Sequence, residues 1–416
     1  MTQESNIFPY IARLLQGAEV VWKPLGELCE FSNTGVDKKT IEGEKKVRLL
    51  NFVDVFHKQY ITKETPTMIV SASDKKILDC NILKGDVFIT PSSEILDEIG
   101  YSATAIEDIE GAVYSYHIMR LRIYDKEILH PEYLAYLFSS DSVRKQIRIK
   151  AQGITRFGLT LPRWKSIQIP LPPLSVQQEI VRILDKFTQL EVELEAELEG
   201  RKWQYEYYRN KLLTFNEIGG GTEIVWKTLG EVFTLRNGYT PSKSNNDFWE
   251  NGTIPWFRME DIRLGSSILK EAIQTITPEA VKGKLFPANT IIMATSATVG
   301  EHALIEVDFM CNQRFTCFIL NKEYQTLFDI KFLYYYFFLL DEKAKQSVNV
   351  SSFPSVQMNE LRKWEIPLPP LEEQQRIATI LDKFDTLVNS ISEGLPKEIA
   401  LRRKQYEYYR EKLLRF

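Results

Sequence analysis

The residues of this sequence best suited to chemistry are basic side chains that could bind phosphate. From Ser142 to Gln178 the sequence holds seven basic residues and no acid, and Asp141 and Glu179 bound this run. Its basic residues are Arg144, Lys145, Arg148, Lys150, Arg156, Arg163 and Lys165. Because lysine and arginine neutralise DNA phosphates and displace counterions, the run predicts salt-dependent contact with DNA. A solvated helix face is the alternative interpretation.

The matching stretch in the second half of the chain is much less basic. The stretch 343–359 is also free of acids, but it carries only Lys343 and Lys345. Bases are read by polar side chains that reach into a groove. The candidates are Thr90, Ser92, Ser93, Thr155 and Arg156 in the first half, and Arg258, Thr295, Ser296, Thr298, Gln313, Arg314, Ser351 and Ser352 in the second. For each of them a solvated loop or a turn cap is an equally good interpretation.

Motifs for catalysis are missing from the sequence. It has no glycine-rich phosphate loop, no GxGxxG after a strand, and no Asn-Pro-Pro-aromatic run of the kind an adenine methyltransferase needs. Four histidines and four cysteines show no metal-ligand spacing. We therefore expect a chain that is not an enzyme and that itself binds neither metal nor cofactor. A nuclease site of carboxylates dispersed in the sequence is the weaker alternative.

Length and composition are those of an ordinary globular chain of several domains. The 52 basic and 56 acidic residues give a net charge of −4, which excludes a uniformly basic coat protein but allows a local basic groove. The most apolar run, Phe332–Leu340, is nine residues long, well short of the ~18–20 that span a membrane. The first residues lack the features of a signal peptide, and the few scattered cysteines suit a reducing compartment. We expect a cytoplasmic location and no membrane partner.

The sequence contains an internal repeat, which decides its architecture. Four blocks recur in the same order at offsets of 197 to 204 residues. They are Trp22–Glu27 and Trp226–Glu231, Ile169–Leu174 and Ile366–Leu371, Leu184–Phe187 and Leu381–Phe384, and Gln204–Arg209 and Gln405–Arg410. The stretches 28–168 and 232–365 between the blocks are far less alike. This pattern predicts two variable modules of one fold on two nearly identical supports; simple drift after a duplication is the alternative.

Each repeat ends in a helix that carries an apolar seam. Pro172-Pro173 and Pro369-Pro370 stop the preceding strand, and apolar residues then recur at alternating steps of three and four. The seam and the repeated tyrosines comprise Ile180, Ile183, Phe187, Leu190, Leu194, Tyr205 and Tyr208 in the first helix, and Ile377, Ile380, Phe384, Leu387, Ile391, Tyr406 and Tyr409 in the second. The seam predicts a partner helix, whereas the tyrosines either pack the helix pair or dock other proteins. Gly394-Leu395-Pro396 should kink the second helix.

These features together predict an α+β fold in which two globular modules are joined by two long antiparallel helices that form a coiled-coil spacer, with a pseudo-twofold internal repeat. The helices should be antiparallel because the first leads through a short linker into the second module, which in turn leads into the second helix. The expected parts are an N-terminal arm 1–17, a first module 18–170, a central helical spacer 171–215, a linker 216–222, a second module 223–367 and a C-terminal helical spacer 368–416.

Two unlike modules on a fixed spacer suit a polymer with a fixed repeat. Dimeric DNA readers place half-sites about 34–36 Å apart, or at multiples of that distance, and a helix over residues 175–213 would span ~58 Å. Since the modules differ in sequence, we expect a bipartite and asymmetric DNA site. The alternative is a structural adaptor whose modules bind proteins and not DNA.

The doubled blocks resemble those of a known family. IPLPPL, LDKF and QYEYYR, each following a module that opens with WK-x-LGE, are similar to the specificity subunit of type I restriction-modification enzymes. The resemblance extends over the chain from about residue 18 and implies two target-recognition domains, a helical spacer that sets the half-site distance, and no catalysis by this chain. It also implies partners: double-stranded DNA, two modification subunits that use S-adenosylmethionine to methylate adenine, and two restriction subunits that translocate and cleave DNA with ATP and Mg²⁺.

Overall fold

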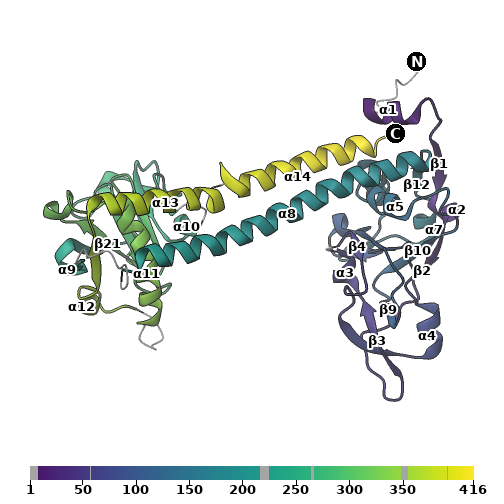
Figure 1. Cartoon of the computed structure of the whole chain (residues 1–416), viewed down its shortest axis with the longest axis horizontal. Helices are drawn as coiled ribbons and strands as arrows, with labels where there is room; N and C mark the ends of the chain where they lie inside the picture. The colour runs from purple at the N-terminus through teal and green to yellow at the C-terminus, as the bar shows by residue number, and fades with distance from the viewer. Residues whose placement is uncertain (1–7, 57, 216–223, 264–266, 348–354, 391) are drawn as a thin grey trace. The chain divides into compact units, whose positions relative to one another are not determined.

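The computed structural model describes residues 8–56, 58–215, 224–263, 267–347, 355–390 and 392–416 (Figure 1). Contacts divide the chain into two compact units. Unit 1 comprises residues 1–191 and 402–416, and unit 2 comprises residues 192–401. Within them, module 1 (residues 21–171) and module 2 (residues 225–368) are the globular parts, each bounded by its first and last strand. The predicted linker 216–222 lies outside the described residues.

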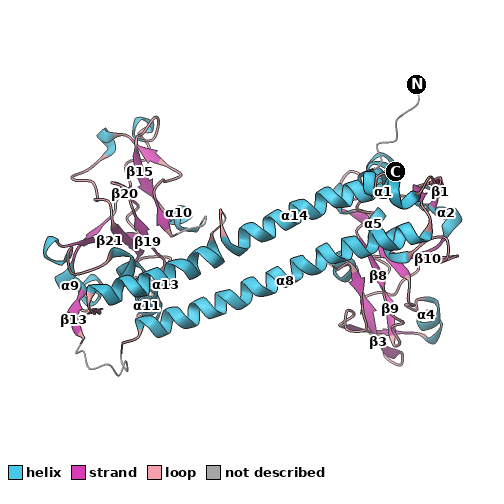
Figure 2. Ribbon diagram, turned by 45° about the horizontal axis from the view of Figure 1, so that its top comes forward, coloured by secondary structure: helices cyan, strands magenta, loops and turns pink. Residues whose placement is uncertain are grey.

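Module 1 is built on a five-stranded and a three-stranded sheet (Figure 2). The larger sheet has the order β2 (Cys29–Ser32), β10 (Met119–Ile123), β6 (Asp86–Ile89), β8 (Ser102–Ala105) and β4 (Tyr60–Ile61), and the smaller has the order β5 (Met68–Ala72), β3 (Lys45–Leu50) and β9 (Ala112–Tyr114). Successive side chains of a strand point to opposite faces. Val87 and Ile89 of β6 accordingly join one hydrophobic core and Phe88 joins another, so both faces of the larger sheet are covered.

Module 2 repeats this topology with different residues. Its larger sheet has the order β14 (Phe233–Asn237), β21 (Phe315–Leu320), β18 (Thr290–Ala294), β19 (His302–Ile305) and β16 (Ile268–Leu269), and its smaller sheet has the order β17 (Thr275–Ile276), β15 (Ile254–Phe257) and β20 (Met310–Cys311). Ile291 and Met293 face one core and Ile292 faces the other. The edge strand β16 pairs in parallel with β19, as β4 does with β8. The α+β fold and its internal repeat are therefore confirmed.

Further helices and short strands connect these sheets. In unit 1 they are α1 (Pro9–Leu15), α2 (Leu25–Leu28), α3 (Phe52–Phe56), α4 (Asp74–Asp79), β7 (Ser92–Ser93), η1 (Leu96–Glu98), α5 (Pro131–Leu137), α6 (Asp141–Lys150), β11 (Phe157–Gly158) and α7 (Leu161–Lys165). In unit 2 they are α9 (Leu229–Val232), η2 (Asn246–Phe248), α10 (Met259–Arg263), η3 (Pro278–Ala280), η4 (Lys322–Tyr324), α11 (Ile330–Gln346) and α12 (Met358–Leu361). In the part of the chain described, no helix is long and apolar enough to cross a membrane.

The repeated sequence blocks close each module. In module 1, β1 (Val21–Pro24) pairs antiparallel with β12 (Gln168–Leu171), so that Trp22 lies opposite Pro170. In module 2, β13 (Val225–Thr228) pairs with β22 (Glu365–Leu368), and Trp226 lies opposite Pro367. The WK-x-LGE and IPLPPL blocks thus recur because they form the same two-stranded closure, which brings the ends of each variable module together at the start of a helix.

The helices that follow are α8, α13 and α14. The 40-residue α8 (Leu174–Leu213) begins in unit 1 and ends in unit 2 (Figure 1). The second long helix is interrupted rather than merely kinked: α13 (Leu371–Asn389) ends before α14 (Gly394–Leu413) begins. Gly394 has a φ of +70° and its Cβ position would collide with the Thr386 carbonyl, so only glycine fits there. Pro396 lies in the first turn of α14, where its missing N–H removes no hydrogen bond.

A buried glutamine attaches each helix to its module. The Gln177 side chain accepts a hydrogen bond from the His130 N–H at 2.9 Å and donates to the carbonyls of Ile128 and Pro172 at 2.8 Å each. Gln374 does the same in unit 2: it accepts from Asp329 N–H and donates to the carbonyls of Leu327 and Pro369. Both glutamines are fully buried. The first glutamine of the repeated pair in unit 1 is thus an anchor, while its neighbour Gln178 is exposed.

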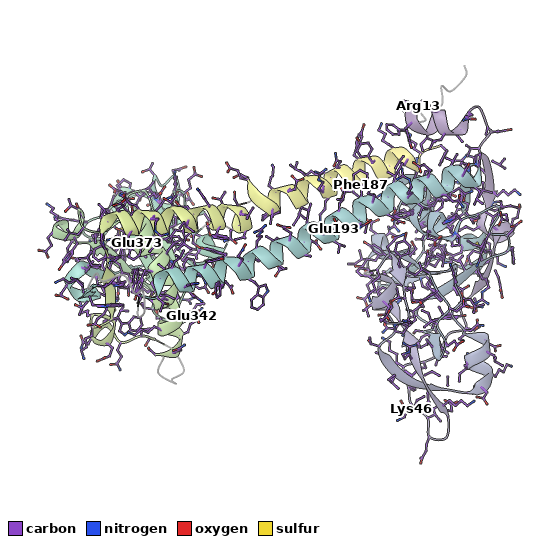
Figure 3. The ribbon with its side chains drawn as sticks, viewed as in Figure 1. Arg13, Lys46, Phe187, Glu193, Glu342 and Glu373 are labelled. Atoms are coloured by element: carbon purple, nitrogen blue, oxygen red, sulfur yellow. The ribbon has the colours of Figure 1, made fainter. Side chains whose placement is uncertain are left out.

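The repeated phenylalanines and tyrosines pack the helices within each unit. In unit 1 the Phe187 ring of α8 lies 5.5 Å from the ring of Tyr409 and 6.4 Å from that of Tyr406 (Figure 3). Glu191 pairs with Arg403 at 2.5 Å, so α8 and α14 run antiparallel there. In unit 2, Phe384 stacks in the same way on Tyr205 and Tyr208, at 6.2 and 5.7 Å. The structure therefore favours helix packing for these four tyrosines over docking of another protein.

The remaining seam residues follow the prediction less closely. Ile180 is buried, with Ile183 packed beside it, in the core that joins module 1 to α8 and the end of α14. Ile377 is buried in the unit 2 core, against which Leu387 packs; Ile380 and Leu194 are half-buried. Leu190 is 37% exposed and is not among the buried residues of the unit 1 core. Ile391 lies outside the described residues.

Candidate nucleic-acid interface

The basic run of unit 1 occupies α6, the loop that follows it, and α7. Ser140 caps α6 by accepting a hydrogen bond from the Val143 N–H, which starts the helix directly before the first basic residue. β11 returns the chain to β7, pairing Phe157 with Ser93. Residues 151–158, which we call loop L1, therefore project beside the end of β6. Gly153 permits the tight turn in L1, since its φ is +137° and a Cβ there would collide with the Arg156 carbonyl.

Two arginines of the run serve the structure instead of facing solvent. Arg144 donates to the carbonyls of Ile99 and Asp97, and burial lowers the pKa of its guanidinium. Arg163 donates to the Lys150 carbonyl at 2.7 Å. Their assignment as phosphate contacts is therefore not supported, because both guanidinium groups already donate hydrogen bonds to backbone carbonyls of the module. Both tie distant segments of module 1 together.

The other basic residues of the run are exposed to different degrees. Arg148 pairs with Asp97 at 2.7 Å, and this contact lowers the pKa of the Asp97 carboxyl. Lys150 donates to the Ser166 hydroxyl at 2.9 Å. Lys145 and Lys165 are exposed and make no ion pair or hydrogen bond with any residue the structure describes. Since a surface pair such as Arg148–Asp97 is worth only ~0.2–1 kcal/mol, Arg148 remains available to a phosphate alongside the two lysines.

Loop L1 collects the exposed candidates for base contact. Thr155 and Arg156 are exposed, and the Arg156 guanidinium donates to the Ser92 hydroxyl at 3.1 Å. Ile154 is 94% exposed, the highest value of any large apolar residue in the described chain. Ile154 is not among the predicted base contacts, although an isoleucine between Gly153 and Thr155 in a polar loop is a visible signal. Apolar side chains at such positions can contact a thymine methyl group.

Two serine and threonine candidates of module 1 lie inside the fold. Thr90 is fully buried; its hydroxyl donates to the Glu98 carbonyl and accepts from the Tyr101 N–H. Ser93 is nearly buried and donates to the Glu98 carboxylate at 2.6 Å. Their proposed contacts with bases are not supported, because both hydroxyls are used to hold η1 against β7 and the residue that follows β6.

Module 2 places its candidates in two separate surfaces. The first resembles L1: Ser296 forms a bridge with Ser355, at the position where β7 meets β11 in module 1. Thr295 is buried against Thr316 at 2.8 Å, so it is not available to DNA, whereas Ser296 and Thr298 are partly exposed. Ser351 and Ser352 lie outside the described residues. Close by in sequence, Lys343 lies over the Trp364 ring and Lys345 pairs with Glu342 at 2.6 Å.

The second surface is a polar concavity of about 450 Å³. It brings together Arg258 and Arg314, which the sequence analysis selected, with Lys243, Asn312 and the edge-to-face pair Trp249 and Trp256. The nearby Gln313 hydrogen-bonds to Thr240. The Arg258 Nε atom is buried without a hydrogen bond, although Glu260 lies 3.5 Å away. Arginine, lysine and amide groups over aromatic rings can bind phosphates and base edges.

Metal-ligating side chains do not cluster in the described part of the chain. No group of three histidine, cysteine, aspartate or glutamate side chains could hold a metal ion there. The most enclosed polar pair is His302 and Asp341, 2.5 Å apart, with the other ring nitrogen 2.9 Å from the Tyr334 carbonyl. These contacts join β19 to α11 inside the core, so their role is to hold the helix against the sheet.

The comparisons of the sequence with known proteins all point to the same family. The family described as Type I restriction modification DNA specificity domain matches residues 18–200 and 223–401. The type I restriction enzyme EcoR124I/EcoR124II specificity subunit of Escherichia coli is 34% identical over 98% of this chain and 97% of its own. The EcoprrI specificity subunit of Escherichia coli is 48% identical, over 50% of this chain and 54% of its own. The HsdS subunit of Thermoanaerobacter tengcongensis has the same fold, with a TM-score of 0.57, 18% identity and coverage of 96% of both chains.

Proposed function

The chain belongs to the type I restriction modification DNA specificity family, and we propose that each of its modules reads one half of a bipartite, asymmetric DNA site. The observation that carries the proposal is that modules 1 and 2 share one topology, whereas their sequences between the repeated blocks are far less alike. A shared framework that carries different loops is what two domains need if they are to recognise different DNA sequences. The reading of the chain as an adaptor that does not bind DNA is disfavoured by the family assignment.

The contacts of module 1 divide into two kinds. Arg148, Lys145 and Lys165 supply positive charge for phosphates and give no sequence preference. Loop L1 supplies Ile154, Thr155 and Arg156 for base edges, with Ser92 holding the Arg156 guanidinium. In module 2 the corresponding base contacts come from the concavity that holds Arg258 and Arg314, with Gln313 beside it, and from Ser296 and Thr298.

The chain selects DNA while other subunits carry out the reactions. We place two modification subunits, which methylate adenine with S-adenosylmethionine, and two restriction subunits, which need ATP and Mg²⁺, around one copy of this chain. A repeated surface feature supports a partner number of two. Tyr207 and Tyr408 are each more than half exposed, and Lys211 and Lys412 lie over their rings at 5.7 and 5.5 Å. In both repeats the tyrosine ring of this pair meets the ring of the next tyrosine, Tyr208 or Tyr409, edge-on and stays largely exposed, as a duplicated docking surface would require.

The proposal is tested by selecting sites from a random duplex pool with the full chain assembled with its modification subunits. We expect a motif in two parts separated by a fixed gap. Arg156→Ala should relax the preference within one part only, and Arg314→Ala within the other, each by about 1–3 kcal/mol per affected base pair. The control Lys75→Ala, at an exposed site on α4, should leave both parts unchanged. An ungapped motif, or loss of both parts in one variant, would refute the claim that each module reads its own half of the site.

A further inference from the structure

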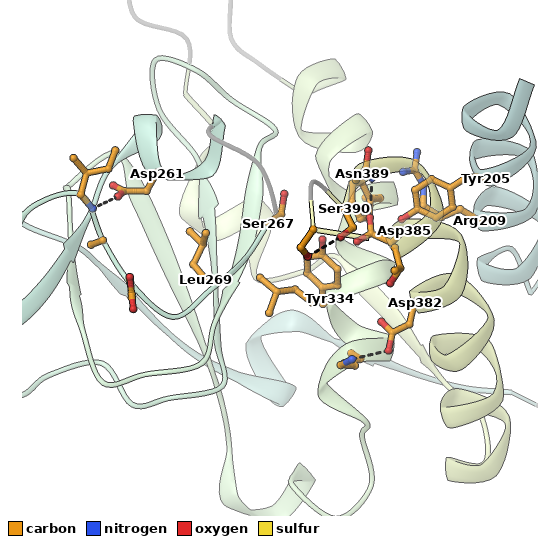
Figure 4. A pocket seen from close by; sticks show the side chains of 18 residues that line it. Tyr205, Arg209, Asp261, Ser267, Leu269, Tyr334, Asp382, Asp385, Asn389 and Ser390 are labelled. Carbon is orange, nitrogen blue, oxygen red and sulfur yellow. Dashed lines mark hydrogen bonds and ion pairs between the residues drawn. The ribbon is translucent and has the colours of Figure 1, made fainter. Parts of the chain in front are cut away.

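Unit 2 contains a cavity of about 920 Å³ that the DNA-reading surfaces do not use (Figure 4). It lies among the end of α8, α11, α13 and the strand β16, all within unit 2. Tyr205 and Arg209 of α8, Tyr334 of α11, and Asp382 and Asp385 of α13 contribute to its walls. A concave site of this volume is typical of a small-molecule pocket.

The corresponding place in unit 1 is filled by one tyrosine. Strand β4 pairs Tyr60 with Thr104, and β16 pairs Ile268 with Leu304 in the equivalent position of the same sheet. The Tyr60 hydroxyl donates to Asp185, which also accepts a hydrogen bond from Tyr136 at 2.7 Å. Burial raises the pKa of the Tyr60 hydroxyl, which keeps it a donor.

Unit 2 keeps the aspartate and loses the tyrosine that fills the space. Asp382 accepts from Tyr335 at 2.7 Å, as Asp185 does from Tyr136, and pairs with Lys331 at 2.6 Å. Ile268 lines the cavity in place of Tyr60, with a shorter side chain and no hydroxyl. The lining of this cavity therefore differs between the repeats at the position of Tyr60 and Ile268.

The walls of the cavity have an excess of negative charge. Four carboxylates line it, those of Asp261, Glu271, Asp382 and Asp385, against the cations of Arg209 and Lys331. Arg209 is stacked on the rings of Phe338 and Tyr205, at 4.2 and 5.2 Å. Burial, followed by the charge of Asp382, raises the pKa of the Asp385 carboxyl. An added cation would offset both effects.

A buried polar group that faces this cavity lacks a well-formed hydrogen bond. Tyr205 is 4% exposed, and its hydroxyl makes no hydrogen bond of normal geometry with any residue the structure describes. Asp385, whose charge acts on the Tyr205 hydroxyl, accepts a side-chain hydrogen bond from Asn389 at 2.8 Å. An unsatisfied buried hydroxyl costs ~1–3 kcal/mol, which a bound ligand with a hydrogen-bonding group would recover.

We propose that this cavity binds a linear polyamine. Carboxylates beside aromatic faces select ammonium groups, and Asp261 lies on one side while Asp382 and Asp385 lie on the other, with Leu269 and Tyr334 between them (Figure 4). A chain of methylene groups with an ammonium group at each end matches acidic ends and an apolar middle. A bare metal ion does not match, because the described residues hold no group of three metal-ligating side chains.

The test is calorimetric titration of the full chain, without DNA, with spermidine as the probe and 1,8-octanediol as its neutral counterpart. The wild-type chain should bind one spermidine and no diol. Asp385→Asn removes a charge from the wall at nearly constant shape, and Ile268→Tyr fills the space as Tyr60 does; each should weaken binding at least about tenfold. Glu372→Gln, at an exposed site at the start of α13, is the matched control and should bind like the wild type.

Three results would overturn the proposal. Equal binding by the wild type, Asp385→Asn and Glu372→Gln would show only non-specific attraction of amines, and no binding by the wild type would show that the cavity does not take a polyamine. Loss of spermidine binding when the modification subunits are added would assign the cavity to a protein side chain. Circular dichroism of each variant separates loss of the site from loss of the fold, and Asp382→Asn provides a second charge variant if Ile268→Tyr does not fold.

Discussion

Replacing Gln177 by leucine should weaken the attachment of α8 to module 1. The substitution leaves three backbone groups without their side-chain partner: the His130 N–H and the carbonyls of Ile128 and Pro172. Each lost hydrogen bond costs about 1–1.5 kcal/mol, and the more apolar leucine side chain returns ~1 kcal/mol. The free energy of unfolding of unit 1 should therefore fall by about 3 kcal/mol. For a unit of this size that corresponds to a fall in the unfolding midpoint of about 6–12 °C.

The assay is differential scanning calorimetry of the full chain, and the sequence offers a matched control. Gln178 is the next residue and is exposed, so Gln178→Leu should change the free energy of unfolding of unit 1 by less than about 0.5 kcal/mol. Gln374→Leu should reproduce the effect in unit 2, because Gln374 makes the same three hydrogen bonds. If Gln177→Leu and Gln178→Leu unfold at the same temperature, the buried glutamine is not the anchor and the reasoning is wrong.

Two further predictions concern the helices. Phe187→Ala and Phe384→Ala should each destabilise their own unit by ~2–3 kcal/mol in urea unfolding, because each ring stacks on two tyrosines of the facing helix; unchanged urea midpoints would count against the packing role. The raised pKa of Asp385 means that the folded state holds its proton to higher pH than the unfolded state does. Its stabilising contribution is therefore present at low pH and lost as pH rises through the folded pKa, with Asp382, Arg209, Lys331 and Tyr205 as the neighbouring charged and titratable groups. Asp385→Asn should gain stability over the wild type as pH rises from about 4 to 7, measured by urea unfolding, and a pH-independent difference between the two would contradict the direction of the shift.

Local signals in the sequence predicted much of the fold. Lys84–Asp86 and Phe286–Asn289 are typical of a turn before a strand, and in the structure Gly85 and Asn289 have positive φ directly before β6 and β18. The alternating residues 117–123 predict a strand and residues 131–138 and 330–340 predict helices; the structure has β10, α5 and α11 there. The internal repeat was decisive, because it identified Phe187 and Phe384, and the tyrosines that face them, as equivalent before any coordinates were considered.

Features that depend on contacts distant in sequence were not predictable. Arg144 looked like a phosphate ligand because its acceptors, the carbonyls of Ile99 and Asp97, come from another segment. The correspondence of Tyr60 with Ile268, and hence the cavity, was hidden because the segments around them have diverged and only the strand register aligns them. Pro396 suggested a kink, whereas the backbone of Gly394 makes the break.

The central claim, that each module reads its own half of the DNA site, is tested most directly by a chain with two equal modules. Residues 28–168 are replaced by a second copy of 232–365; the two segments end at equivalent positions of the β1–β12 and β13–β22 pairs. The site selected by this chain, assembled with its modification subunits, is then determined from a random duplex pool. The account predicts a gapped site with two identical halves, each the sequence read by module 2. An unchanged asymmetric site, or a site without a gap, would contradict it.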